Sequence, residues 1–456
     1  MSSLFPAHPT SPARAARRLV SLSDLRRLAA GRIPGQVVIQ YTDRCNASCA
    51  QCGMRVGNRF PRSTLRPEIL WPQIEAMARR GVAAISFTGG EPLLCLKDIA
   101  PLARRARDAG IRYVRTGTNG FLFREHDHPD FAARMADLAK TLVAGGFNAF
   151  WISVDSADAD LHEKNRGLPG VIQGIKKALP ILHDHGLFPA ANLGINRLTG
   201  GPDCPPPHDT ADPESFDAAA FTAHFRQAFR RFYAFVESLG FTTVNACYPM
   251  SAEEAPPDDA RASESKTVQA REAVYAATST DSFIRFSPAE KAALFSALYE
   301  VIPEYRGRLR IFTPRSSLFS LVRHYSGSPQ DGHYPCRGGI DFFFMDAARG
   351  HIFPCGYRGD EDLGPFSDLN PASIRTKPFC TRCDWECFRD PSELLGPVMD
   401  LFARPLSLAR RFLADPAYRR VWITDVRYAL ACDGCSAVIP PDKRKLARFA
   451  NPASAA

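Results

Sequence analysis

The sequence lacks any apolar run long enough to cross a membrane. Its most apolar short stretches, such as Phe-Phe-Phe-Met at 342–345, fall far below the roughly 20 residues that a spanning helix needs. The first 18 residues contain arginines but no apolar core after them, so the pattern of a secretory signal is also missing. These absences predict a cytoplasmic protein without a membrane span.

Blocks of one charge are missing too. The net charge of +9 is spread along the chain, mostly as arginine, and no Lys/Arg block marks a nucleic-acid arm. We therefore expect no nucleic-acid partner. Apolar residues make up 45% and charged residues 23%, as in ordinary globular proteins, and there is no internal repeat. A chain of 456 residues has room for one large domain and a smaller one.

Cysteine, in contrast, is plentiful, with thirteen residues. In a reducing compartment these are poor disulfide candidates, and clustered cysteines indicate metal ligands or catalytic groups. Cys95, Cys204 and Cys247 stand alone in the sequence and are expected to be small core or loop residues.

Apolar, β-branched runs alternate with segments of helical spacing. The predicted strands are 36–41, 83–87, 112–116, 149–154, 188–195 and 241–246, and the predicted helices between them are 68–80, 99–109, 130–144, 171–185 and 216–239. This alternation is typical of a parallel sheet with helices packed outside it. Six such units predict an α/β fold, a partial (β/α)6 barrel of the TIM type, with its chemistry at the C-terminal ends of the strands.

The chain divides into three predicted parts. Residues 1–34 form a loose tail and a short helix capped by Ser23, and residues 35–325 form the partial barrel. Residues 326–456 form a small cysteine-rich α+β extension with a basic C-terminal segment. Two polar stretches, near 199–215 and 251–282, are predicted as inserts in the barrel.

Three cysteines follow the first predicted strand with the spacing C-x3-C-x2-C: Cys45, Cys49 and Cys52. Thiolates suit iron–sulfur clusters, and three of them within eight residues can surround only one small object. Three ligands for four irons leave one iron open to a group that carries both an amine and a carboxylate. Zinc is the alternative, because it also takes thiolate ligands.

The second predicted strand ends in Thr-Gly-Gly-Glu-Pro at 88–92. A strand, C-x3-C-x2-C and then G-G-E-P at the next strand end resemble the radical S-adenosylmethionine (SAM) superfamily. The resemblance implies that the three cysteines hold a [4Fe–4S] cluster that cleaves SAM reductively. It also implies that Gly89, Gly90 and Glu91 bind the amino group of SAM. Gln51 departs from the family pattern, which usually has an aromatic residue just before the third cysteine.

Other residues take an expected role from this resemblance. Asn119 lies at the end of the third strand, and Ser153 and Asp155 resemble the segment near the ribose of SAM. Arg166 matches a position that helps with the SAM carboxylate or ribose, and Asn192 on the fifth strand is a further SAM-binding candidate. Alternatively, Asp155 caps a helix and Arg166 is a surface residue.

Seven more cysteines lie in the last third of the chain: Cys336, Cys355, Cys380, Cys383, Cys387, Cys432 and Cys435. Cys336 and Cys355 resemble the start of the SPASM or twitch extension of radical SAM enzymes, although C-x2-C-x3-C follows where a full SPASM domain has one more cysteine. The resemblance implies one auxiliary [4Fe–4S] cluster, held by Cys336, Cys355 and two of Cys380, Cys383 and Cys387. Seven cysteines are also enough for a second cluster, and zinc is the alternative for the last two cysteines.

The reaction implied by the resemblance is abstraction of a substrate hydrogen atom by a 5′-deoxyadenosyl radical. The substrate is expected to be a small molecule or a peptide, and a peptide maturase of the SPASM type is one alternative. The electron is expected from a low-potential donor such as flavodoxin or ferredoxin. An iron–sulfur electron carrier or a zinc scaffold is the non-enzyme alternative, which the G-G-E-P run disfavours. The sequence leaves the substrate and the oligomeric state open.

Overall fold

The computed structural model describes the chain in several ranges. These are residues 22–52, 62–205, 216–249, 282–327, 334–359, 361–370, 374, 380 and 383–450. The predicted tail at 1–18 lies outside the described residues, as do nearly all of the predicted insert at 251–282 and the later part of the one near 199–215. No helix in the described ranges is both long enough and apolar enough to cross a membrane.

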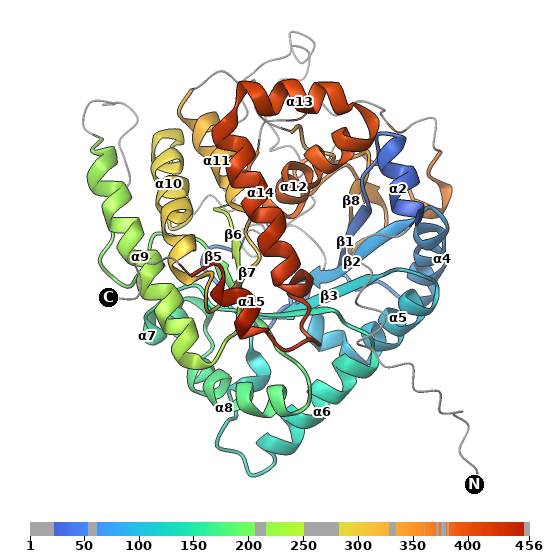
Figure 1. Ribbon diagram of the computed structural model, residues 1–456. Coiled ribbons are helices and arrows are strands. Elements are labelled where there is room, and N and C mark those ends of the chain that lie inside the picture. Colours follow the sequence, from blue (N-terminus) through green and yellow to red (C-terminus); the bar gives the residue numbers. More distant parts are fainter. Residues whose placement is uncertain are drawn as a thin grey trace, which may run out of the picture.

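A curved sheet of nine strands forms the centre of the molecule, in the order β7-β6-β5-β4-β3-β2-β1-β8-β9 (Figure 1). Seven of its strands follow one another in chain order and pair in parallel. They are β1 (Gly35–Thr42), β2 (Val82–Gly89), β3 (Tyr113–Thr118), β4 (Ala149–Ser153), β5 (Ala190–Gly194), β6 (Thr243–Cys247) and β7 (Arg310–Ile311). The α/β partial barrel predicted from the alternation is therefore confirmed, with β7 as an additional short parallel strand.

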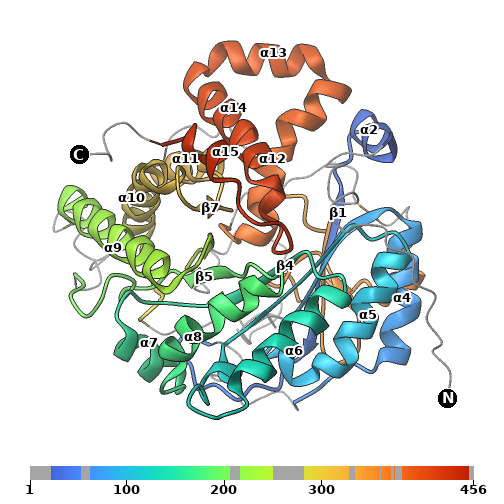
Figure 2. The same ribbon diagram turned by 60° about the horizontal axis from the view of Figure 1, so that its bottom comes forward.

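Amphipathic helices cover the outer face of the sheet. They are α4 (Pro67–Arg79), α5 (Leu96–Asp108), α6 (Phe131–Ala144), α7 (Ala159–Arg166), α8 (Val171–Asp184), α9 (Ala218–Leu239), α10 (Pro288–Tyr305) and α11 (Arg315–Tyr325). Side chains such as Val37, Ile39, Ile85 and Val114 are fully buried between sheet and helices. Figure 2 shows α4, α5, α6 and α8 together on one side of the sheet.

Two short helices differ from expectation. Helix α2 (Leu22–Ala29) already includes Ser23, the predicted cap, whose side chain lies outside the described part of the structure. Helix α7 was not predicted, because it spans only eight residues and its sequence is polar. The side chain of Asp158 caps α7 by accepting from the amide of Leu161 at 2.9 Å. Asp155 is therefore not the cap of the helix that follows β4.

The C-terminal part of the chain adds two strands to the barrel sheet. Strand β8 (Phe342–Met345) pairs in parallel with β1 and antiparallel with β9 (Ile352–Phe353), with Gly350 at φ +70° between β8 and β9. These two strands form a hairpin, and the pairing of β8 with β1 was not expected from the sequence. The barrel sheet thus continues into the extension, and the division of the chain at 325/326 stays a prediction.

Four α-helices of the described ranges follow this hairpin, and the first of them begins at the inner face of the sheet. They are α12 (Glu386–Ala403), α13 (Pro405–Ala414), α14 (Pro416–Ala431) and α15 (Lys443–Ala447). Trp385 and Phe388 at the start of α12 pack with Val38 and Phe344. The side chain of Gln36 donates to the carbonyl of Cys387 at 3.0 Å. The start of α12 therefore lies against the inside of β1 and β8, opposite the outer helices (Figure 2).

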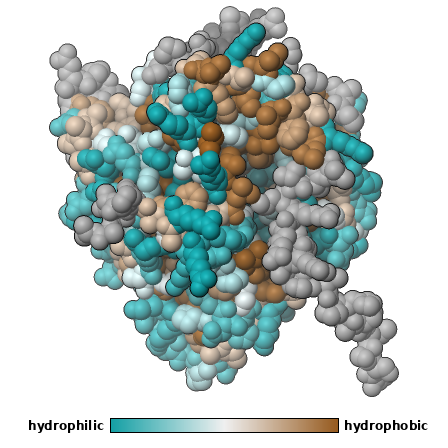
Figure 3. All heavy atoms as spheres, in the orientation of Figure 1, coloured by the Kyte–Doolittle hydropathy of each residue, from teal (hydrophilic) through white to brown (hydrophobic). Residues whose placement is uncertain are grey.

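Apolar side chains also reach the surface of this region. Leu406 and Leu413 of α13 are 75% and 73% exposed. The brown atoms at the top of Figure 3 lie over α13.

Candidate active site

The loop that carries Cys45, Cys49 and Cys52 leaves the C-terminal end of β1 and packs on the end of β2. The amide of Gly90 donates to the carbonyl of Thr42 at 2.7 Å, and the amide of Glu91 donates to the carbonyl of Arg44 at 2.9 Å. A Cβ on Gly89 would overlap the Thr42 carbonyl, and one on Gly90 would overlap the Arg44 carbonyl. The glycine pair thus lets the loop backbone approach β2 closely.

Glu91 is buried beneath this loop. Its carboxylate accepts from the amide of Leu93 at 3.0 Å and from the amide of Asn119 at 2.6 Å. Burial raises the pKa of Glu91 to about 7, and the amide donors oppose that rise. The Glu91 carboxylate, which was expected to contact the SAM ammonium, thus already joins the end of β2 to the end of β3 through these two hydrogen bonds.

Asn119 connects the end of β3 to the first cysteine. Its Nδ2 lies 3.6 Å from the Sγ of Cys45 and donates to the Oδ1 of Asn46 at 2.9 Å. The amide of Ala47 also donates to the Cys45 sulfur, at 3.4 Å. Burial raises the pKa of the Cys45 thiol, and these two donors lower it. Such donors stabilise a sulfur that carries negative charge, as a metal-bound thiolate does.

An ion pair lies behind the second cysteine. Arg166 at the end of α7 binds the buried carboxylate of Asp155 through two nitrogens, at 2.8 and 3.0 Å. Burial alone would raise the pKa of Asp155, but the Arg166 charge holds it below its usual range. The positive charge of Arg166 also opposes the rise to about 11 that burial imposes on the pKa of Cys49.

The cysteine loop binds this ion pair directly. The amide of Ser48 donates to the Arg166 carbonyl at 2.7 Å, and the Nε2 of Gln51 donates to Asp155 at 3.0 Å. Gln51, which departs from the family pattern, therefore attaches the loop to β4. The alternative that Arg166 is a free surface residue is wrong, because its side chain is 11% exposed and fully engaged with Asp155.

Ser153 and Asn192 lie next to each other on β4 and β5, in register with Asn245 on β6. Asn192 accepts from the Nδ2 of Asn245 at 2.7 Å, and its own Nδ2 lies 3.4 Å from the Sγ of Cys247. Cys247, expected as an isolated small residue, thus belongs to a polar row on the inner face. Glu386 and Cys387 are the titratable neighbours of the Cys247 thiol.

The C-terminal cysteines separate into three sets. The amide of Cys336 donates to the carbonyl of Cys380 at 2.8 Å, and the thiols of Cys336, Cys355, Cys380 and Cys383 are electrostatic neighbours. Burial raises the pKa of Cys336 and of Cys355 to about 12. Cys387 instead faces Glu386 and Arg115, and Cys432 and Cys435 pair with each other at the end of α14.

Within the described ranges, no three Cys, His, Asp or Glu side chains converge on one point as a single metal ion would require. A [4Fe–4S] cluster is a larger object, in which each thiolate binds its own iron, so its ligands surround it. The loop of three cysteines with its N–H donors, and the group of Cys336, Cys355, Cys380 and Cys383, fit such clusters by donor type and number. The pair at the end of α14 offers only two thiols.

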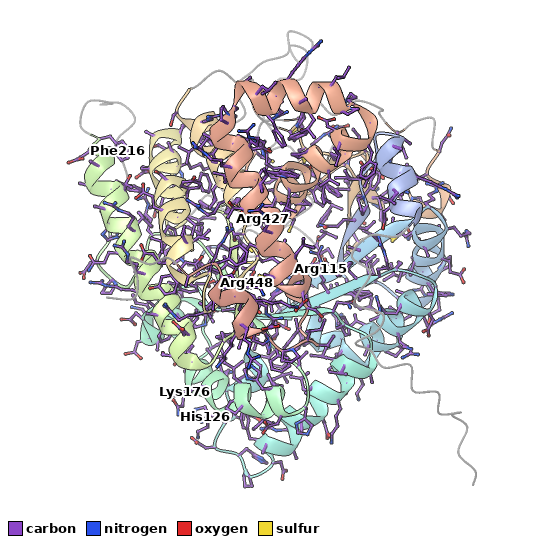
Figure 4. The ribbon with its side chains drawn as sticks, in the orientation of Figure 1. Arg115, His126, Lys176, Phe216, Arg427 and Arg448 are labelled. Carbon is purple, nitrogen blue, oxygen red and sulfur yellow. The ribbon has the colours of Figure 1, made fainter. Side chains whose placement is uncertain are left out.

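Arg115 is a site candidate that the sequence prediction missed. It lies on β3 between the buried, outward-facing Val114 and Thr116, and its Nε donates to the Oγ of Ser86 at 2.9 Å. In the described part of the chain it forms no ion pair, and the Cys387 thiol is its titratable neighbour. Figure 4 labels it near the centre of the molecule. A charged residue inside a predicted strand was the signal.

The barrel segment is similar to known proteins. Residues 39–203 match the family model of the radical SAM superfamily. An AdoMet-dependent heme synthase of Methanosarcina barkeri is 27% identical over 155 residues, which cover 34% of this chain and 41% of that protein. A GTP 3′,8-cyclase of Lactiplantibacillus plantarum is 34% identical over 154 residues, which cover 32% of this chain and 42% of that protein.

The chain thus matches less than half of the length of either relative. Among solved structures, native anSMEcpe with bound AdoMet aligns with a TM-score of 0.46 at 14% identity. That alignment covers 75% of this chain and 81% of the other chain.

We predict that Gly90→Ala releases the cysteine loop from β2. The added Cβ overlaps the Arg44 carbonyl, so the loop backbone must move, at a cost of about 1–3 kcal/mol. Iron bound per chain after anaerobic reconstitution should fall, and the free energy of unfolding in urea should fall with it. Gly110→Ala is the control for destabilisation alone: its φ of +106° strains an alanine although no atom lies within 4 Å of the added Cβ, so stability should fall, but it follows α5 away from the cysteine loop, so bound iron should not. Unchanged iron in Gly90→Ala would contradict the packing role of this glycine.

We predict that acid weakens the fold through His162. Its ring is buried, its Nδ1 accepts from the amide of Asp155 at 3.1 Å, and burial lowers its pKa to about 4. The unfolded chain therefore takes up a proton first as pH falls from about 6.5 to 4, and about 3 kcal/mol of stability is lost. His162→Gln keeps an acceptor that does not titrate. If the free energies of unfolding of the wild type and of His162→Gln change with pH in parallel, this role of His162 is refuted.

Proposed function

We propose, from the premise that residues 39–203 belong to the radical SAM superfamily, that the chain is a radical SAM enzyme acting on a substrate bound at the inner face of the barrel. The observation that carries this proposal is the loop of Cys45, Cys49 and Cys52 at the end of β1. Its sulfurs are free thiols, and N–H donors approach the first of them. The matched relatives are named as enzymes.

When bound, a [4Fe–4S] cluster and SAM supply the reductive cleavage that yields a 5′-deoxyadenosyl radical. The protein holds the reactive groups in place and excludes water. Cys45, Cys49 and Cys52 are proposed as the iron ligands, with Asn119 stabilising the first sulfur. Arg166 keeps positive charge behind Cys49 and anchors the loop through its carbonyl.

Gly89, Gly90 and Glu91 are proposed to shape the SAM site mainly through the backbone. The buried Glu91 holds the ends of β2 and β3 together, so the free backbone groups of this segment keep fixed positions. Ser153, Asp155 and Asn192 are proposed on the SAM side of β4 and β5.

The inner face is proposed as the substrate site. It presents the amide row of Asn192 and Asn245, the Cys247 thiol and the guanidinium of Arg115. An arginine without a carboxylate partner favours a substrate that carries an anionic group at this position. The heme synthase and the GTP cyclase that match the barrel are named for small-molecule chemistry, which supports a small molecule over a peptide.

An auxiliary [4Fe–4S] cluster is proposed on Cys336, Cys355, Cys380 and Cys383. This choice keeps Cys387 out of the ligand set and on the substrate side, near Arg115. The auxiliary cluster would lie beside α12, between the inner face and the surface, where it can pass electrons to or from the substrate. A low-potential donor such as flavodoxin or ferredoxin is proposed as the source of the first electron.

We expect anaerobically reconstituted protein to form 5′-deoxyadenosine from SAM and dithionite. Cys45→Ala, Cys49→Ala and Cys52→Ala should each reduce the product to background, because each removes one iron ligand of the cluster that binds SAM. Cys204→Ala, a cysteine outside both groups, is the control and should keep the activity. Wild-type protein that binds iron but forms no 5′-deoxyadenosine would overturn the proposal in favour of an electron carrier.

We expect iron counting to separate the C-terminal cysteines. Wild-type protein should hold about eight irons per chain, four for each of two clusters. Cys383→Ala should lose about four of them, while Cys387→Ala, only four positions away, should lose none. Electron paramagnetic resonance of the reduced proteins should show the same division. Equal iron loss in the two variants would refute the proposed ligand set.

A further inference from the structure

Cys432 and Cys435 lie at the end of the barrel opposite the first cysteine loop. The loop of Cys45 follows the C-terminal end of β1, whereas the residues after Cys435 pack at the N-terminal ends of the strands. The amide of Ala437 donates to the carbonyl of Asn148, which precedes β4, at 2.7 Å. The pair is therefore remote from the proposed SAM site, and the proposed function leaves it without a role.

The backbone between the two cysteines is unusual. Asp433, Gly434 and Cys435 have φ values of 49°, 65° and 54°, so three successive residues are left-handed. Asp433 and Cys435 are the only non-glycine residues with positive φ in the described ranges. Such conformations cost energy and persist where the surrounding structure holds them. Here the turn brings the two thiols into a hydrogen bond with each other.

A buried arginine faces the pair. Arg310 is 1% exposed, and its Nη1 donates to the carbonyls of Ser436 and Ile439 at 2.9 and 2.8 Å. Its Nε and Nη2 are buried and have no hydrogen-bond partner among the described residues. The thiols of Cys435 and Cys432 and the carboxylate of Asp433 are the titratable acidic groups around Arg310.

Asp433 does not neutralise this arginine. Its carboxylate binds the Nζ of Lys445 at 3.0 and 3.1 Å, at the surface. Burying N–H donors without partners costs free energy of folding, so an anion next to the cysteines would stabilise Arg310. A thiolate at Cys435 meets this requirement.

The two thiols are not equivalent. Cys432 is 1% exposed and caps the C-terminal end of α14, where the partial negative charge of the helix disfavours a thiolate. Cys435 is partly exposed and accepts a hydrogen bond from Cys432. That bond and the charges of Arg310 and Arg306 lower the pKa of Cys435, whereas the same bond raises the pKa of Cys432. Cys435 is thus the nucleophile and Cys432 the resolving thiol.

We propose that Cys432 and Cys435 form a redox-active dithiol that exchanges with low-molecular-weight disulfides. The thiolate of Cys435 attacks one sulfur of the disulfide, forms a mixed disulfide and releases one thiolate. Cys432 then loses its proton, attacks the sulfur of Cys435 and releases the second thiolate. Two protein thiols are oxidised to one intramolecular disulfide, and one small disulfide is reduced to two thiols.

A metal ion fits this pair less well. Within the described ranges no third Cys, His, Asp or Glu joins the two thiols in a metal-binding group, and Asp433 is held by Lys445. A zinc site needs about four ligands. Zinc binding by these two cysteines is therefore the contrary result that the experiment below can detect.

The test uses the full-length protein, incubated anaerobically in mixtures of reduced and oxidised glutathione, then alkylated and digested. Mass spectrometry of the peptide that contains both cysteines should show conversion from two free thiols to one disulfide as the mixture becomes more oxidising. Cys432→Ser should accumulate a glutathione adduct at Cys435, whereas Cys435→Ser should form none at Cys432. Cys204→Ser, as the control, should behave as wild type.

Arg310 is tested separately by the rate of Cys435 alkylation at neutral pH. Arg310→Met should slow it on the order of tenfold, as expected for a rise of about one unit in thiol pKa, and Arg310→Lys should slow it less. Circular dichroism identifies variants that fail to fold, and Arg310→Lys keeps the test usable if Arg310→Met is one of them. The readout does not depend on SAM cleavage.

Two results would overturn the proposal. One is a pair that stays fully reduced in oxidised glutathione while the protein remains folded. The other is one zinc ion per chain that is lost in Cys435→Ser, which would assign the pair to metal binding.

Discussion

The ion pair between Asp155 and Arg166 is the contact on which the arrangement of the site depends. It joins β4 to the end of α7, and its two members hold the cysteine loop through Gln51 and Ser48. The carboxylate of Asp155 is buried, so removal of either partner would leave an uncompensated charge away from water. The loop therefore has a rigid support on one side, and on its other side the ends of β2 and β3 are fixed by Glu91.

The C-terminal part of the chain is built into the barrel sheet and is not a separate appendage. Strand β8 extends the sheet beyond β1, and α12 begins against the inner face, with its backbone bound to Gln36. This placement brings Glu386 and Cys387 towards Arg115 and Cys247, which belong to β3 and β6. Cys380 and Cys383, a few positions earlier, lie beside Cys336 instead. Cys383 and Cys387, which are close in the sequence, thus lie in different surroundings.

The two ends of the barrel differ in their chemistry. At the C-terminal ends of the strands, a loop of thiols meets backbone and amide donors that suit a metal-bound sulfur. At the N-terminal ends, a buried arginine with unused donors faces two thiols in a strained turn. The first end offers three thiols with N–H donors and the charge of Arg166, which favours cluster binding, and the other offers two thiols beside a buried arginine, which favours thiolate reactivity.

Local sequence patterns are enough to predict the parallel barrel and the first cysteine loop. Strand and helix periodicity report on local burial, and C-x3-C-x2-C keeps its meaning because three residues so close in sequence remain close in space. The predicted positions of Glu91 and Asn119 at strand ends followed from the same periodicity. Tertiary structure alone decided that Gln51 binds Asp155, that β8 pairs with β1, and which C-terminal cysteines share a site. These contacts join residues tens to hundreds of positions apart, and their geometry is set by packing that no local pattern encodes.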